Sequence, residues 1–241
     1  MSKIKMIFFR VLIIGIIGTI AGLCLYFLIA IGRVRFRHFE RFPLFGEKLI
    51  IVVNHPSTKE TYLIPLVFFP WWFRKFLKPH PIPISTPDRN NFPYLILLKE
   101  YVVFIDRSKK GVYKRMRAIF QMIKNLEEGA NIILFIEGTR TGNALEKIIS
   151  PKGKEMGVPQ SSLGFLVEKT GAGIFPLWVE TSWSCPNKIP FFLQVLIEML
   201  SLPFVTTEII CGETIKFGIK EPDEEITRKT IEAMFALADE G

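Results

Sequence analysis

The chain has 241 residues, of which 49% are hydrophobic, and it carries a formal net charge of +8 at pH 7. This length allows one substantial domain with an anchor, or two small domains. Its three cysteines are few and widely spaced, which excludes a disulfide framework and a cysteine-based metal site. The positive charge is consistent with an anionic partner, either a nucleic acid or an anionic surface, and equally with a solvated charged face that has no specific partner.

The N-terminal part of the chain is strongly apolar. Residues 11–32 contain no charged side chain, and as a helix they would span roughly 33 Å, about the thickness of a bilayer core. A signal peptide would normally be shorter and would end in a small-residue cleavage site. The pattern therefore predicts a retained membrane-anchoring helix, which could kink at its glycines and re-enter instead of spanning. The basic and aromatic residues 33–48 are typical of a juxtamembrane linker. Beside such an anchor, we expect membrane lipids and no nucleic acid as partners.

Short apolar runs and amphipathic segments alternate through the rest of the chain. The patterns predict strands at 49–53, 101–105, 131–135 and 174–179, and helices at 112–128, 162–170 and 223–239. Residues 61–77 are apolar and aromatic, but Pro65 and Pro70 argue against a long helix there. Residues 189–206 form another apolar stretch, and residues 207–217 predict one or two short strands.

This alternation predicts an α/β fold with a largely parallel or mixed sheet flanked by helices. We assign residues 1–37 to the N-terminal anchor and juxtamembrane segment, and residues 38–241 to one domain. In such sheets, ligands bind beyond the carboxyl ends of the strands. The charged turns that follow the first three strands are therefore expected to converge on one edge of the sheet.

His55 and Glu60 lie five residues apart in NHPSTKE, directly after the first predicted strand. A lone histidine at such a place is more often structural than catalytic. A carboxylate bonded to one imidazole nitrogen, however, fixes the tautomer and makes the other nitrogen a better base. Asn54 and Ser57 can hydrogen-bond the backbone of this turn. The sequence contains no GxSxG and no cysteine near a histidine, so the pair indicates a base that activates a substrate hydroxyl.

Two further clusters place an arginine just after a predicted strand. FIDRSKK spans residues 104–110 and contains Arg107, while FIEGTRTG spans residues 135–142 and contains Arg140. Arginine can hold a phosphate through two parallel hydrogen bonds. Taken singly, each cluster is equally consistent with a solvated surface loop.

In order and spacing, these segments resemble the motifs of the glycerolipid acyltransferase family, which includes 1-acylglycerol-3-phosphate acyltransferases. NHPSTKE resembles the family's NHxSxxD, with glutamate in place of aspartate. FIDR at 104–107 resembles the second motif, and FIEGTRT at 135–141 resembles FPEGTRS, with Ile136 in place of proline. The proline-containing predicted strand at 174–179 resembles the fourth motif of the family, a hydrophobic strand around a proline. The resemblance covers roughly residues 38–180.

The resemblance implies roles for these residues. His55 would deprotonate the acceptor hydroxyl, which then attacks the acyl thioester, and Glu60 would orient His55 and stabilise its charged form. The implied substrate-binding residues are Ser57, Arg89, Arg107, Glu137, Gly138, Thr139 and Arg140, with the arginines on the acceptor phosphate. Arg89 is included because residues 83–87 lack the lysine that many phosphatidate-forming members carry there. No metal or prosthetic group is implied.

We therefore expect a membrane-bound O-acyltransferase. It would move a fatty acyl group from acyl-CoA or acyl carrier protein to 1-acyl-sn-glycerol 3-phosphate, forming phosphatidic acid. Its expected location is the inner or cytoplasmic membrane, with the catalytic domain facing the cytoplasm. The alternatives are acyl transfer to glycerol 3-phosphate, another lysophospholipid or a glycolipid; hydrolysis of the thioester by water; and a non-catalytic membrane-binding module.

Overall fold

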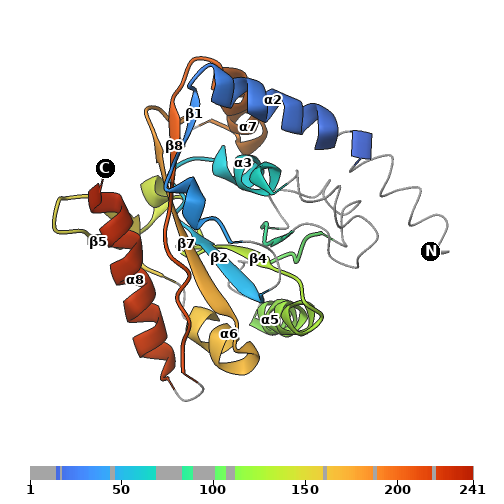
Figure 1. Cartoon of the computed structure of the whole chain (residues 1–241), viewed down its shortest axis with the longest axis vertical. Coiled ribbons are helices and arrows are strands. Elements are labelled where there is room, and N and C mark those ends of the chain that lie inside the picture. The colour runs from blue at the N-terminus through green and yellow to red at the C-terminus, as the bar shows by residue number, and fades with distance from the viewer. Residues whose placement is uncertain are drawn as a thin grey trace.

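The computed structural model describes residues 15, 16, 18–43, 47–68, 83–88, 101–106, 112–159, 162–186, 189–218 and 221–240. Within them, a six-stranded sheet has the order β1-β8-β7-β2-β4-β3 (Figure 1). Its strands are β1 (Val34–Arg37), β2 (Leu49–Val53), β3 (Ile84–Ser85), β4 (Ile132–Phe135), β7 (Gly173–Thr181) and β8 (Thr207–Cys211). Neighbouring strands are parallel except β7 and β8, which are antiparallel. The fold is thus α/β with a mixed sheet, as predicted.

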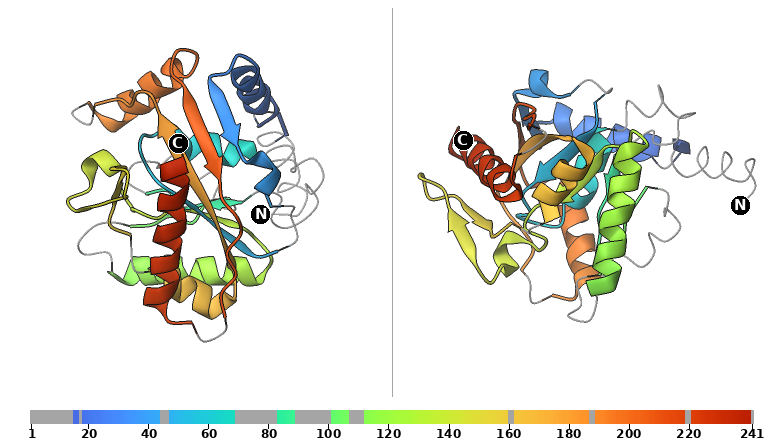
Figure 2. Two further views of the ribbon diagram at one scale, coloured as in Figure 1. Left: turned by 60° about the vertical axis from the view of Figure 1, so that its left-hand side comes forward. Right: turned by 90° about the horizontal axis from the view of Figure 1, so that it is seen from below.

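Helices cover both faces of this sheet. One face carries α2 (Gly18–Ala30) and α3 (Glu60–Val67), and the other carries α5 (Val112–Glu127), α6 (Ser162–Thr170) and α8 (Asp223–Glu240). Figure 2 shows α8 lying along β7 and β8. The connection from β7 to β8 contains α7 (Phe191–Ser201). A small antiparallel hairpin, formed by β5 (Lys147–Ile149) and β6 (Glu155–Gly157), projects from the body.

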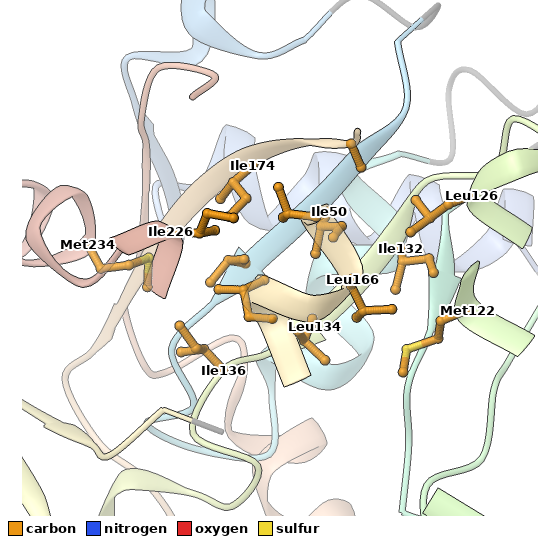
Figure 3. Close-up of a cluster of buried hydrophobic side chains, with 14 of the residues drawn as sticks. Ile50, Met122, Leu126, Ile132, Leu134, Ile136, Leu166, Ile174, Ile226 and Met234 are labelled. Carbon is orange, nitrogen blue, oxygen red and sulfur yellow. The ribbon is translucent and has the colours of Figure 1, made fainter. Parts of the chain in front are cut away.

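Alternating side chains of the central strands divide the core into two clusters. In β2, whose sequence is LIIVV, all five residues are buried, as expected for a strand covered on both faces. Ile50 and Val52 face α5, α6 and α8, whereas Ile51 and Val53 face α2 and α3. Figure 3 shows the first cluster, in which Met122 and Leu126 of α5 pack near Ile132.

Most of the predicted elements are confirmed, with two corrections. The helix at 162–170 and the strand at 49–53 have the predicted bounds, and α5 ends just before Gly129, whose φ is +85°. Residues 101–105 form no regular strand; they contribute isolated bridges from Val102 to Ser85 and from Ile105 to Asp88. Residues 34–37, assigned above to a juxtamembrane segment, form strand β1 and pair with β8.

The predicted anchor falls only partly within the described residues. Its residues 18–30 form α2, whose Leu25 and Leu28 are buried, while Leu23 and Phe27 are exposed. Across the described ranges, no helix has both the length and the apolar character needed to cross a membrane. Residues 1–14 and 17 lie outside those ranges, so a membrane anchor stays a prediction. Of the apolar segment 61–77, residues up to Val67 belong to the short helix α3, which contains Pro65.

Candidate active site

His55 and Glu60 are brought together by the turn between β2 and α3. His55 lies two residues after the carboxyl end of β2, and Glu60 is the first residue of α3. The Nδ1 atom of His55 lies 2.6 Å from Oε1 of Glu60. The Glu60 side chain is fully buried, whereas the His55 side chain keeps 11% of its surface exposed. The predicted contact between this histidine and carboxylate is therefore present in the fold.

Ser57 completes the hydrogen bonding of the Glu60 carboxylate. Its backbone N–H donates to Oε1 at 2.8 Å, and its hydroxyl donates to Oε2 at 2.6 Å. Because an ionised carboxylate only accepts hydrogen bonds, the proton of the neutral His55 ring belongs on Nδ1, and Nε2 carries the lone pair. No described residue hydrogen-bonds to Nε2. This nitrogen is accordingly available as a base.

The turn after β4 is bonded directly to the backbone of His55. Glu137 Oε1 accepts the His55 N–H at 2.7 Å and the Thr141 hydroxyl at 2.9 Å, and its Oε2 accepts the Gly157 N–H at 2.7 Å. In return, the Thr141 N–H donates to the His55 carbonyl at 2.8 Å. Burial raises the pKa of Glu137, and these hydrogen bonds oppose that shift. Two of the three charged turns thus converge on the sheet edge, and both Glu137 oxygens are occupied by protein donors.

The same turn supplies a cation close to His55 and Glu60. Gly138 adopts a positive φ of 67°, which allows the tight turn that leads to Thr139 and Arg140. Thr139 and Arg140 are partly buried. Burial lowers the pKa of Arg140, while the negative charges of Glu198 and Glu60 oppose that shift. Its guanidinium makes no hydrogen bond or ion pair with any residue in the described ranges.

The third charged turn is only partly described. Asp106 is buried and accepts a bond from Lys114 Nζ at 2.9 Å. Arg107 and Arg89, both predicted to bind the acceptor phosphate, lie outside the described residues, so their predicted roles stay predictions. In the described ranges, the His, Cys, Asp and Glu side chains form no group that could hold a metal ion.

Three buried side chains in this region have contacts that the sequence did not indicate. Asn54 exchanges two bonds with the Val179 backbone, donating to its carbonyl at 2.9 Å and accepting its N–H at 2.6 Å. It therefore ties the turn to β7 instead of to its own backbone. Lys59 is fully buried, and its ammonium donates to the Thr181 hydroxyl at 3.0 Å. The ring of Phe135 lies against that of His55, with 4.7 Å between the ring centroids.

Two comparisons relate this fold and site to known proteins. The family model described as Acyltransferase matches residues 33–180, more than half of the chain. Among solved structures, PlsC, the 1-acyl-sn-glycerophosphate (LPA) acyltransferase from Thermotoga maritima, matches with a TM-score of 0.56 and 18% sequence identity. That match covers 92% of this chain and 76% of PlsC, and it shows a shared fold. No curated protein sequence matches the chain. On the extent of the family match, the chain belongs to the acyltransferase family.

Proposed function

We propose that this protein is a membrane-bound acyltransferase that esterifies a glycerolipid hydroxyl. The preferred acceptor is 1-acyl-sn-glycerol 3-phosphate, the donor is acyl-CoA or acyl carrier protein, and the product is phosphatidic acid. The observation that carries this proposal is the buried 2.6 Å contact between His55 Nδ1 and Glu60 Oε1. Nε2 of His55 has no nucleophilic side chain bonded to it among the described residues, so its partner in the reaction is a hydroxyl of the substrate.

The reaction follows from the protonation state of this pair. His55 Nε2 removes the proton of the acceptor hydroxyl as its oxygen attacks the carbonyl carbon of the acyl thioester. The Glu60 carboxylate stabilises the imidazolium that forms. As the tetrahedral intermediate collapses, the carbon–sulfur bond breaks and the proton passes from Nε2 to the leaving thiolate. The ester and the free thiol are the products, and the histidine is neutral again.

The acceptor phosphate is assigned to the arginines of the predicted motifs. Arg140 supports this assignment because it is a partly buried cation with no bonded partner in the described part of the chain. Gly138 and Thr139 would line the same turn, with Arg107 and Arg89 as further phosphate ligands. Glu137 contributes indirectly in this proposal, because its oxygens hold the backbone of His55 and not the substrate.

Membrane association is proposed from the N-terminal region. Residues 11–32 carry no charge, and within α2 the side chains of Ile20, Leu23 and Phe27 are exposed. An exposed apolar helix face of this kind is suited to contact with lipid. We propose that the domain sits on the inner or cytoplasmic membrane and faces the cytoplasm. There it would meet both the lipid acceptor and the acyl-CoA or acyl carrier protein donor.

A panel of acceptors and donors tests this function. Purified protein is incubated with a labelled acyl donor, either acyl-CoA or acylated acyl carrier protein, and the products are identified by mass. The acceptors are lysophosphatidic acid, glycerol 3-phosphate, a neutral lysophospholipid and a glycolipid. Release of free fatty acid without transfer would instead indicate thioester hydrolysis. Lipid binding without turnover would indicate a binding module.

Matched histidine variants test the mechanism within this panel. His55→Ala and Glu60→Ala are expected to abolish transfer. His38→Ala is the control, because His38 is a partly exposed histidine paired with Glu240 and Glu40. Transfer that persists in both His55→Ala and Glu60→Ala would refute the proposed chemistry.

A further inference from the structure

Helix α7 has its polar side chains on the inside and its apolar side chains on the outside. Its sequence, FFLQVLIEMLS, has two buried residues, Gln194 and Glu198, one turn apart. Its exposed large apolar residues are Phe192, Leu193, Leu196, Met199 and Leu200. A fully buried glutamate is rare unless its charge is compensated. The contacts of Glu198 are therefore informative. Both α7 and Glu198 lie beyond the region matched by the family model.

Glu198 reaches the turn that carries the catalytic pair. Its Oε2 accepts the Thr58 backbone N–H at 2.7 Å and also the Thr58 hydroxyl, and its Oε1 accepts the Cys185 N–H at 2.9 Å. Its charge also favours the protonated forms of Lys59 and Arg140, against the burial that lowers the pKa of each. The buried carboxylate is thus compensated by three donors and by two nearby cations.

Two consecutive N–H groups of this turn are held by carboxylates from different helices. The N–H of Ser57 donates to Glu60, the first residue of α3, and the N–H of Thr58 donates to Glu198 of α7. Thr58 lies between His55 and Glu60 in sequence, so any shift of Thr58 moves the segment that joins the two catalytic groups. Within the described residues, Glu198 forms no hydrogen bond or ion pair with His55 or Glu60, and it acts on them through the backbone.

We propose that Glu198 is a positioning residue of the active site. It fixes the turn of residues 54–60 from the side of α7, so that His55 Nδ1 and Glu60 Oε1 keep their contact. This inference rests on the proposed acyl transfer for its kinetic consequence. Its geometric consequence, the state of the His55 ring, can be measured whatever reaction the protein catalyses.

The kinetic test compares Glu198→Ala with a matched variant on the same helix. Glu198→Ala removes the acceptor for two buried N–H groups, so the turn relaxes, and a misplacement of about 1 Å can cost about 100-fold in rate. We expect kcat to fall about 10- to 100-fold, with KM for lysophosphatidic acid changed less than about threefold. Glu198→Gln, which keeps one carbonyl oxygen, should fall between Glu198→Ala and the wild type. Gln194→Ala, which removes the neighbouring buried polar side chain, should leave kcat within about twofold.

The spectroscopic test follows the His55 ring by NMR of imidazole nitrogens in the full-length protein. The chain has only three histidines, so His55→Gln assigns the signal. In the wild type, the Nδ1 proton held by Glu60 should be shifted downfield and protected from exchange. Glu198→Ala should weaken both features, whereas Gln194→Ala should not. Thr58→Val, which removes only the hydroxyl contact, should have a smaller effect and provides a second variant if Glu198→Ala folds poorly.

The outcomes separate this inference from the proposed function. If wild-type protein transfers no acyl group but the His55 signal responds to Glu198→Ala as described, the function is wrong and the positioning role stands. If Glu198→Ala and Gln194→Ala lower the unfolding temperature equally, and neither changes kcat or the His55 signal, the positioning role is overturned. A rise in KM with an unchanged kcat would also overturn it, because Glu198 would then act on substrate binding.

Discussion

Replacing Glu60 by glutamine removes a charge while keeping the shape of the site. If the amide oxygen of the new side chain takes the place of Oε1, it still accepts the His55 Nδ1–H and the Ser57 N–H. The amide NH2 then faces the Ser57 hydroxyl, which can accept a hydrogen bond. The fold should therefore survive, and the lost quantity is the attraction between the carboxylate and the imidazolium that forms during the reaction.

The size of this loss follows from Coulomb's law. The two bonded atoms are 2.6 Å apart, and the Glu60 side chain is fully buried. Because both charges are delocalised, we take about 4 Å as the separation of the charge centres. At an effective dielectric constant of about 20, two unit charges at that separation attract by about 4 kcal/mol. Each 1.4 kcal/mol corresponds to about tenfold in rate, so Glu60→Gln should lower kcat about 1,000-fold. Glu60→Asp keeps the charge and matches the residue usual in the resembling family, and it should stay within about tenfold of wild type.

The assay is transfer of a labelled acyl group to lysophosphatidic acid under saturating conditions, with product identified by mass. Thermal unfolding of each variant is measured alongside, because a loss of fold would also remove activity. Normal kcat in a folded Glu60→Gln protein would refute the charge-based pairing of Glu60 with His55. A larger loss in Glu60→Asp than in Glu60→Gln would show that side-chain length, and not charge, controls the rate.

Three further variants probe the site and the packing between α6 and α8. Asn54→Ala leaves the buried Val179 N–H and carbonyl without their partner, so denaturant unfolding should show a loss of about 2–4 kcal/mol; a loss below about 0.5 kcal/mol would show that the bridge is dispensable. Gly164→Ala places a Cβ 2.5 Å from the backbone of Asp223. Although alanine favours a helix, this overpacking between α6 and α8 should destabilise the fold by about 1–3 kcal/mol, and a more stable variant would contradict the reasoning. Arg140→Gln should raise KM for lysophosphatidic acid about tenfold or more, with a smaller change in kcat. An unchanged KM would refute the proposal that Arg140 binds the acceptor phosphate.

Much of the fold is predictable from local sequence patterns. The continuous apolar run of β2 predicts a strand buried on both faces, and it is confirmed at residues 49–53. Strand β1 escaped prediction although its sequence, VRFR, alternates apolar and basic residues as a half-buried strand does. Four residues beside an apolar segment are a short signal, and the partner strand β8 lies far away in the chain. Residues 101–105 show the opposite error, since a strand-like composition is realised only as isolated bridges.

In the candidate site, likewise, some contacts could be predicted from the sequence and others could not. The contact between His55 and Glu60 could be predicted because a five-residue spacing and one turn bring them together. The bond from His55 to Glu137 depends on the parallel register of β2 and β4, which no local pattern specifies. The bond from Thr58 to Glu198 spans 140 residues. Its trace in the sequence is a single carboxylate within a helix whose other residues are apolar except for Gln194 and Ser201.

The backbone of His55 is hydrogen-bonded to the turn that follows β4. After the last paired residues of these strands, Ile136 donates to the Val53 carbonyl at 3.1 Å, and Thr141 donates to the His55 carbonyl at 2.8 Å. The position of His55 therefore depends on the register in which β2 pairs with β4. Inserting a residue between 135 and 141 would move Glu137 or Thr141 away from its hydrogen bond to the His55 backbone, so the length of this segment is fixed by the site.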